Sequence, residues 1–153
     1  LDILKGILSV TFISNYILQQ NTYVPENIVR IISGVACIAG HNWTIFLGFK
    51  GGKGVATSLG VLIGLGIVNA NLRIIFFLVI LVWSLIFLLS RMVSLASILS
   101  ILCLPLLMFI FRQPKELIIM SIILSVFAIL RHKANIQRIL QGKEPRIHFK
   151  KTN

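Results

Sequence analysis

Long apolar runs separated by short polar breaks occupy nearly the whole chain, and this pattern predicts helices embedded in a membrane. Six runs are long enough to cross a hydrocarbon core of about 30 Å, or nearly so. They cover residues 3–20, 24–47, 55–70, 72–90, 92–111 and 115–130. The third run is short and contains Gly60, Gly64 and Gly66, so it predicts a helix that packs closely on its neighbours and need not span the membrane.

The composition excludes an ordinary soluble domain. Hydrophobic residues make up 57% of the 153 residues, and the mean hydropathy is +0.96. We therefore expect an all-α, polytopic membrane helix bundle with about six transmembrane or membrane-embedded helices, in a single domain over residues 1–153. A net charge of +11 also suits nucleic-acid binding, but Lys and Arg in membrane proteins more commonly set topology, and we expect no nucleic-acid partner.

The distribution of basic residues predicts the orientation in the membrane. The tail, residues 131–153, contains seven Lys and Arg residues against one acid, Glu144, which predicts that it is cytoplasmic. Six spans put both ends of the chain on that side, and alternation along the chain then places eleven of the fifteen basic residues there. The tail pattern predicts a helix over residues 132–140.

The strongest candidate for chemistry is a glycine- and lysine-rich loop between the second and third runs. Gly51, Gly52 and Gly54 let backbone N–H groups approach an anion, Lys53 adds a full charge, and the next helix start adds a positive dipole end. The loop is not a Walker A motif, because Leu47 stands where the first glycine is needed, so ATP hydrolysis is not indicated. A phosphate site and a simple tight turn explain these residues equally well.

Other polar residues at the predicted membrane edges are weaker candidates. His132 can exchange protons and Asn135 can orient a substrate, although both also suit the flank of a basic tail. Arg91 and Ser94 can bind an anion or simply begin a helix, and His41 alone is more often a packing residue. The histidines are too far apart and the acids too few for metal-ligand spacing, so we predict no metal and no cofactor.

Taken in order, these segments resemble the bacterial acyl-phosphate:glycerol-3-phosphate acyltransferases of the PlsY type. The segments that carry the resemblance are Asp2-Ile3-Leu4-Lys5-Gly6, Gly40-His41, Phe49-Lys50-Gly51-Gly52-Lys53-Gly54-Val55-Ala56-Thr57, Arg91-Met92-Val93-Ser94, Arg131-His132-Lys133-Ala134-Asn135-Ile136 and Gly142-Lys143-Glu144. They cover nearly the whole chain. The glycine-lysine block and the His-x-x-Asn-Ile segment together are far more specific than a lone glycine-rich loop.

The resemblance implies a reaction and its partners. A fatty acyl group is transferred from acyl phosphate to the 1-hydroxyl of sn-glycerol 3-phosphate, giving lysophosphatidate and inorganic phosphate in phospholipid biosynthesis. The expected partners are glycerol 3-phosphate, acyl phosphate and membrane lipids. The expected location is the bacterial cytoplasmic (inner) membrane, with multiple passes and with the active-site loops and the C-terminus in the cytoplasm.

The resemblance also implies roles for particular residues. It assigns glycerol 3-phosphate binding to Gly51, Gly52, Lys53, Gly54 and Ser94, and catalysis to His132 and Asn135. It assigns supporting positions to His41, Lys50, Arg91, Glu144 and Lys5, with Glu144 tied to structural integrity.

The sequence departs from the family at its start. Members have a further N-terminal span and a first motif rich in glycine and asparagine before the segment that begins at Asp2, and this chain is expected to lack both. An upstream segment or a companion chain is therefore a further expected partner. The alternative functions are an organic-phosphate transporter, which paired repeats would favour although none is evident, and a non-catalytic membrane partner subunit whose tail binds anionic lipids.

Overall fold

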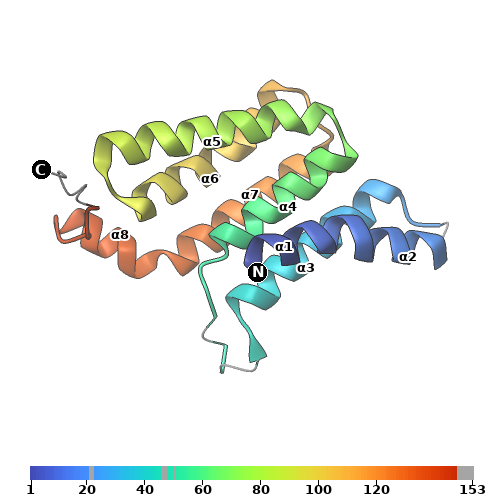
Figure 1. Ribbon diagram of the computed structural model, residues 1–153, viewed down its shortest axis with the longest axis horizontal. Helices are drawn as coiled ribbons and strands as arrows, with labels where there is room; N and C mark the ends of the chain where they lie inside the picture. The colour runs from blue at the N-terminus through green and yellow to red at the C-terminus, as the bar shows by residue number, and fades with distance from the viewer. Residues whose placement is uncertain (21–22, 46–47, 50, 148–153) are drawn as a thin grey trace, which may run out of the picture.

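The computed structural model describes residues 1–20, 23–45, 48–49 and 51–147, and every extended regular element in these ranges is a helix. The elements are α1 (Asp2–Leu8), the π-helical segment η1 (Ser9–Ile13), α2 (Ser14–Gln20), α3 (Glu26–Asn42), α4 (Val55–Val68), α5 (Asn71–Ser90), α6 (Val93–Ile110), α7 (Lys115–Arg131) and α8 (Lys133–Leu140). α1, η1 and α2 follow one another without a break. α5 and α6 run side by side, α6 packs on α7, and α1 packs on α4 (Figure 1).

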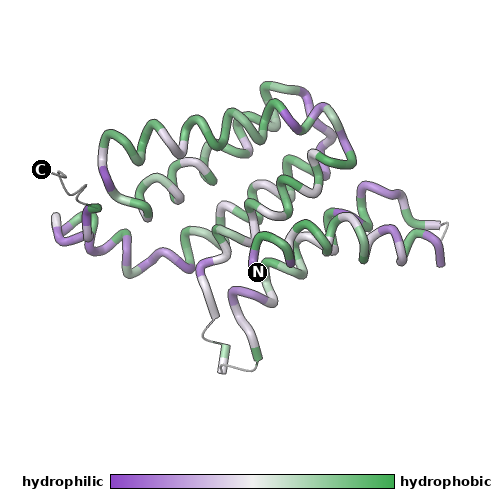
Figure 2. The backbone as a smooth tube through the Cα atoms, viewed as in Figure 1, coloured by the Kyte–Doolittle hydropathy of each residue, from purple (hydrophilic) through white to green (hydrophobic). Residues whose placement is uncertain are grey.

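The predicted apolar runs all form helices. Two helices in the described residues, α5 and α6, are long and apolar enough to cross a membrane, and α7 with α8 makes a third candidate if the pair, bent by 65°, is one span. The 20 residues of α5 correspond to about 30 Å of helix, the thickness of a hydrocarbon core. The long apolar stretches of α5 and α6, with polar residues at the helix ends and in α8, are visible in Figure 2.

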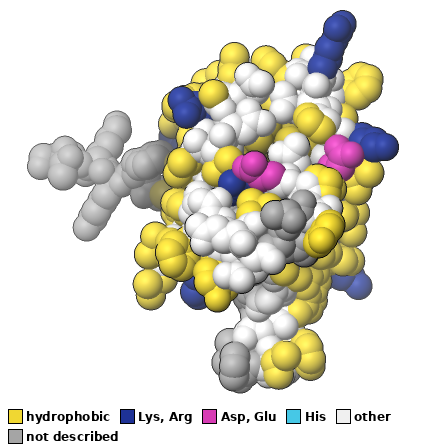
Figure 3. All heavy atoms as spheres, turned by 90° about the vertical axis from the view of Figure 1, so that its right-hand side faces the viewer, with side chains coloured by type: hydrophobic (Ala, Val, Ile, Leu, Met, Phe, Trp, Pro, Cys, Tyr) yellow, Lys and Arg dark blue, Asp and Glu magenta, His cyan; other side chains and the backbone are white. Residues whose placement is uncertain are grey.

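The outward surface of the bundle is apolar, as a membrane protein requires. On α5 the side chains of Ile74, Phe77, Leu81, Leu85 and Leu88 are exposed, and their spacing of three or four residues puts them on one face of the helix. Figure 3 shows hydrophobic side chains over much of the surface and only scattered charged groups. Apolar surface of this extent is stable in contact with lipid rather than water.

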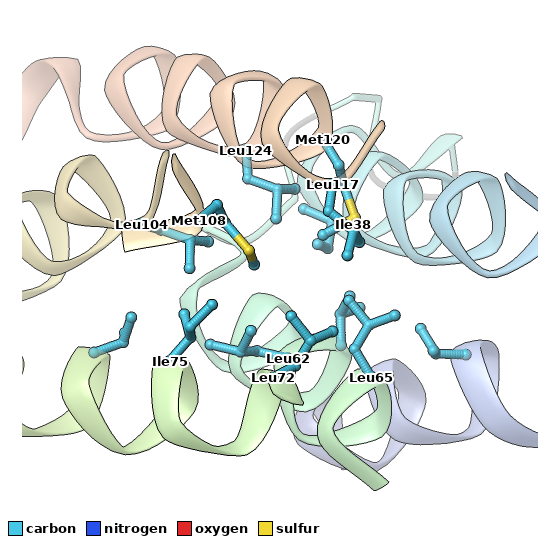
Figure 4. Close-up of a cluster of buried hydrophobic side chains, with 13 residues drawn as sticks. Ile38, Leu62, Leu65, Leu72, Ile75, Leu104, Met108, Leu117, Met120 and Leu124 are labelled. Carbon is cyan, nitrogen blue, oxygen red and sulfur yellow. The ribbon is translucent and has the colours of Figure 1, made fainter. Parts of the chain in front are cut away.

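The core lies where α4, α5, α6 and α7 meet. Its buried side chains include Leu62, Ile75, Met108 and Met120, which point toward one another from four helices (Figure 4). On the other side of α4, glycines allow a close approach to α1: a Cβ at Gly60 would overlap a main-chain carbonyl oxygen of α1. This confirms the prediction that the short, glycine-rich helix packs tightly against a neighbour.

A buried arginine stabilises the π-helical segment. Widening the helix at η1 changes the main-chain hydrogen bonding, and Arg30 Nη1 donates to the carbonyl oxygen of Val10 at 2.7 Å. The same guanidinium donates to Asn15 Oδ1 at 2.8 Å and to Glu26 Oε1 at 2.7 Å. Arg30 is only 6% exposed, so these acceptors offset the cost of burying its charge.

The predicted second apolar run is wrong at its C-terminal end. It was expected to continue to residue 47, but α3 ends at Asn42, and Trp43 leaves helical geometry with φ −126° and ψ 56°. The reason is that the carbonyl oxygen of His41 accepts a hydrogen bond from the N–H of Gly52 at 3.1 Å, so the returning loop occupies the place of the next helical turn. Residues 46–47 lie outside the described residues.

Candidate functional site

A cavity of about 580 Å³ lies at the end of the bundle where α3 ends and α4 and α6 begin. The loop before α4, the corner between α7 and α8, and the segment after α8 complete its wall. Its polar lining consists of Asp2, His41, Gly52, Lys53, Gly54, Ser94, Ser97, His132, Asn135 and Glu144. Residues from both ends of the chain are therefore brought to one cavity.

The glycine loop lies flat against the end of α3. A Cβ at Gly51 would overlap the carbonyl oxygen of His41, and a Cβ at Gly52 would overlap the His41 imidazole. Gly54 has φ +73°, a left-handed conformation that favours glycine, and it directly precedes α4. Three glycines are therefore required for two different reasons, contact at Gly51 and Gly52 and backbone conformation at Gly54.

The N-terminus of α4 faces the cavity without a capping side chain. Gly54 has no side chain to cap it, and Val55 and Ala56 of the first turn line the cavity. The first N–H groups of a helix have no partner inside the helix and carry the positive end of its dipole. Together with Lys53 they form a site suited to an anion such as a phosphate.

His132 is the most buried polar group at the cavity. It is 2% exposed, and neither ring nitrogen has a hydrogen-bond partner among the described residues. It occupies the bend between α7 and α8, beyond the apolar segment. Burial, with the positive charge of Lys53 nearby, lowers the pKa of His132 to about 4 although Glu144 opposes this shift. The imidazole is therefore neutral at neutral pH, with both nitrogens available to a ligand.

Glu144 organises the floor of the cavity. Its Oε1 accepts hydrogen bonds from Asn135 Nδ2 at 2.7 Å and from the hydroxyl of Ser94, and its Oε2 accepts from Arg138 Nε at 2.8 Å. Burial alone would raise the pKa of Glu144, but these hydrogen bonds outweigh burial and hold the pKa at about 2. The carboxylate thus fixes two residues that the sequence predicted to act on substrate.

A second cavity adjoins the polar one from inside the bundle. It has a volume of about 460 Å³, is lined mainly by apolar residues of α4, α5, α6 and α7, and shares Val55, Ala56, Val93 and Ser97 with the polar cavity. A groove of about 1010 Å³ between α1, α2 and α3 adjoins the polar cavity as well and shares Asp2, His41 and Gly52 with it. The polar cavity therefore has apolar space next to it of the kind that an acyl chain requires.

The structure brings most of the predicted site residues together. Gly52, Lys53, Gly54, Ser94, His132 and Asn135 line the polar cavity, as do the supporting residues His41 and Glu144. Gly51 and Lys5 line the adjoining groove instead, and Lys5 Nζ forms an ion pair with Asp2 Oδ1 at 3.0 Å. Arg91 lies outside the lining, at the left-handed turn after α5. Lys50 lies outside the described residues.

Sequence reasoning counted Arg131 in the basic tail and in a segment that carries the family resemblance, but assigned it no role at the site. Arg131 Nε donates to the carbonyl oxygen of Gly52 at 2.9 Å, and its Nη2 donates to that of Gly51. The available signal was its place in the chain, directly before His132.

Comparison with known proteins decides the family. A family model described as glycerol-3-phosphate acyltransferase matches residues 1–142. The chain belongs to this family. The glycerol-3-phosphate acyltransferase of Trichormus variabilis is 37% identical over 162 residues, which cover 99% of this chain and 69% of that protein. The enzyme of the same name from Halalkalibacterium halodurans is 37% identical over 155 residues, covering 99% of this chain and 70% of that protein.

Solved structures agree with this assignment. The glycerol 3-phosphate form of PlsY, an integral membrane glycerol 3-phosphate acyltransferase, superimposes with a TM-score of 0.71 and 39% identity, over 78% of this chain and 57% of that one. The lysophosphatidic acid form of PlsY gives 0.77 and 34%, over 94% of this chain and 69% of that one. This chain thus spans between 57% and 70% of the length of these relatives. The predicted family and the predicted all-α membrane bundle are confirmed.

Proposed function

We propose that this chain catalyses transfer of a fatty acyl group from acyl phosphate to the 1-hydroxyl of glycerol 3-phosphate, with lysophosphatidate and phosphate as products. The observation that carries this proposal is one cavity that joins Lys53, the uncapped start of α4 and the neutral His132 to an apolar space inside the bundle. A phosphorylated, hydroxyl-bearing acceptor and a lipid-chain donor both fit this combination.

The phosphate of glycerol 3-phosphate is assigned to the glycine loop. Gly51, Gly52 and Gly54 keep the main chain close to the ligand, Lys53 supplies a cation, and the first N–H groups of α4 supply aligned donors. Ser94 donates its proton to Glu144, so its hydroxyl oxygen is assigned to a glycerol hydroxyl of the ligand rather than to the phosphate. A hydroxyl in this state can accept a hydrogen bond but has no proton left for the ligand.

The acyl chain is assigned to the apolar cavity. Residues at the start of α4 and of α6 belong to both cavities, so the acyl carbonyl lies at their junction when the chain fills the apolar one. Burial of an alkyl chain contributes about 0.8 kcal/mol per CH₂ group. This energy holds the donor while its phosphate end stays in the polar cavity.

The chemistry needs alignment more than activation, because acyl phosphate is already reactive. A bond forms between the acceptor hydroxyl oxygen and the acyl carbon, the bond from that carbon to the phosphate oxygen breaks, and phosphate leaves. With a pKa near 4, His132 accepts a hydrogen bond from the hydroxyl and orients it but is a weak base. The hydroxyl proton therefore ends on the departing phosphate, and Asn135 orients the carbonyl or the hydroxyl beside it.

The supporting residues act through these groups. The carbonyl oxygen of His41 accepts the hydrogen bond from the N–H of Gly52, and the His41 ring packs against Gly52. The Nδ1 of His41 lies 3.6 Å from Asp2 Oδ1. Lys5 shares that carboxylate. Arg91 ends α5 in a left-handed conformation, and its carbonyl oxygen accepts the N–H of Ile147 at 2.9 Å, which ties the segment after α8 to the cavity.

We place the cavity on the cytoplasmic side of the bacterial inner membrane. The predicted topology puts five basic residues on the same side of the membrane as the cavity, in agreement with the preference of basic residues for the cytoplasm. They are Lys53, Arg131, Lys133, Arg138 and Lys143. A single cysteine at the exposed Lys133, in a variant without Cys37 and Cys103, should react with an impermeant thiol reagent only in inside-out vesicles. Labelling in right-side-out vesicles would reverse the orientation.

The test of the function is product formation by membranes that contain this chain. Lysophosphatidate and phosphate are measured with glycerol 3-phosphate and either acyl phosphate or acyl-coenzyme A as donor. Lys53→Gln should raise the KM for glycerol 3-phosphate by about ten- to a hundredfold, the loss of one charge-assisted contact. The matched control is Lys133→Gln, which removes the same charge from an exposed position and should change KM less than about twofold.

The outcomes separate the candidate functions. Product from acyl phosphate alone supports the proposed donor, and product only from acyl-coenzyme A contradicts it. Uptake of glycerol 3-phosphate into vesicles without acyl transfer would indicate a transporter. Equal activity of Lys53→Gln and the wild-type protein would contradict the assigned phosphate site.

A further inference from the structure

Arg131 ends α7 beside the cavity, and its guanidinium bonds to main chain rather than to a carboxylate. None of the ion pairs formed by the described residues includes Arg131. Its guanidinium instead donates to two consecutive main-chain carbonyl oxygens, those of Gly51 and Gly52, the latter at 2.9 Å. The contact joins residues about 80 positions apart and connects the last turn of α7 directly to the glycine loop.

These two hydrogen bonds determine how the loop peptides are turned. The peptide between Gly51 and Gly52 is held at both ends, because its N–H donates to the carbonyl oxygen of His41 at 3.1 Å and its carbonyl accepts from Arg131. Among the described residues, the peptide between Gly52 and Lys53 is held by its carbonyl alone. In a trans peptide the N–H points opposite to the C=O, so the N–H of Lys53 points away from Arg131. Lys53 itself lines the cavity.

The guanidinium is itself held in place. Its carbon lies 5.9 Å from the centre of the Trp43 ring, and Trp43 meets Phe127 edge-on with 4.9 Å between ring centres. The loop is thus confined between His41 on one side and Arg131 on the other. Glycine is required at Gly51 and Gly52 because a Cβ would overlap His41.

We propose that Arg131 is a positioning residue that turns the Gly51–Gly52–Lys53 main chain so that the N–H of Lys53 binds the phosphate of the substrate. It contacts the loop rather than the ligand, and this role rests on the proposed function of the cavity. Two carbonyl oxygens need the flat, forked donor set of a guanidinium, which a lysine ammonium cannot reproduce. Charge near the cavity is therefore the lesser part of the role, and hydrogen-bond geometry is the greater part.

Arg131→Lys and Arg131→Gln separate geometry from charge. Both variants should raise the KM for glycerol 3-phosphate and the Kd for inorganic phosphate by about tenfold, with a smaller change in kcat at saturation. Lys133→Gln, the exposed neighbour on the next helix, should leave both values within about twofold. An Arg131→Lys variant equal to wild type would show that charge suffices and would overturn the proposal.

Chemical rescue distinguishes positioning from general loss of structure. In Arg131→Ala, added guanidinium ion should restore phosphate binding at least about fivefold, whereas ammonium at the same ionic strength should not, because only guanidinium bridges two carbonyl oxygens. Trp43 fluorescence, read in a Trp83→Phe background, reports whether the loop is in place in each variant. If Arg131→Ala is unfolded while Arg131→Lys is well folded and fully active, Arg131 has a structural role only.

Phosphate binding is measured without acyl transfer, so the two proposals can fail separately. If the wild-type protein forms no lysophosphatidate but binds inorganic phosphate in a manner that depends on Arg131, the proposed reaction fails and the positioning role stands. If acyl transfer occurs and none of the Arg131 substitutions changes phosphate affinity, the positioning role fails and the reaction stands.

Discussion

Replacing Glu144 by alanine should destabilise the folded protein more than any other single carboxylate change. The substitution removes the acceptor for Ser94 and Asn135, which are 7% and 4% exposed. Each buried donor left without a partner costs about 1–3 kcal/mol. Arg138 is 43% exposed and can be resolvated, so its loss adds about 0–1 kcal/mol.

The sum is about 4 kcal/mol, which corresponds to a fall in Tm of about 8–16 °C for a chain of this size. Unfolding of the purified protein in detergent micelles, followed by circular dichroism, measures the change. Glu144→Gln keeps one acceptor oxygen of the same shape and should lose about half as much. Glu116→Ala is the control: Glu116 lies in the first turn of α7, is part of no ion pair among the described residues, and should cost less than about 1 kcal/mol.

The pH dependence gives an independent check on the same carboxylate. Because the folded-state pKa of Glu144 is about 2, below its ordinary value of 4.5, its contribution to stability is complete above pH 4.5 and is lost as pH falls toward 2. The wild-type protein should lose stability over this interval and Glu144→Gln should lose less. A Tm for Glu144→Ala within about 2 °C of the wild-type Tm, with no difference in acid sensitivity, would refute the assigned network.

Three further predictions test other parts of the molecule. Gly52→Ala should abolish phosphate binding without unfolding the bundle, because the new methyl group overlaps the His41 imidazole. The control Gly40→Ala has nothing within 4 Å of the added Cβ and should bind phosphate normally. Calorimetry with inorganic phosphate measures both variants. In NMR of histidine-labelled protein, the His132 signal is the one that disappears in His132→Gln, and it should titrate near pH 4. The stability of the wild-type protein should fall as pH drops from 6.5 toward 4, because the folded state binds fewer protons than the unfolded state. Arg30→Gln should cost about 3 kcal/mol in unfolding experiments, against less than about 0.5 kcal/mol for the exposed Arg112→Gln.

Local pattern predicted the helices well because each apolar run has to satisfy its own main chain inside a membrane. The fourth run was predicted over residues 72–90, and α5 is Asn71–Ser90. The error at the end of α3 has a long-range cause, since the N–H of Gly52 competes for the carbonyl oxygen of His41. A window of neighbouring residues contains no information on that contact.

The site shows the same division between local and long-range causes. Resemblance to a family selected Lys53, Ser94, His132 and Asn135, and the structure places all four at one cavity. The resemblance did not indicate that Ser94 donates its proton to Glu144, 50 residues away. Because of this hydrogen bond, the Ser94 hydroxyl can only accept a hydrogen bond from a ligand. Such pairings depend on how helices pack, and nothing in residue type or spacing along the chain specifies them.

The charges around the cavity imply that anion binding and proton binding are coupled. Glu144 is committed to three donors and Arg131 to two carbonyl oxygens, which leaves Lys53 as the cation that acts on His132. A phosphate beside Lys53 offsets the repulsion that helps to lower the pKa of His132, so bound phosphate must raise that pKa. Linkage requires the reverse as well: protonation of His132 must tighten phosphate binding by the same free energy. Burial is the larger cause of the low pKa and persists with ligand bound, so bound phosphate reverses only part of the shift.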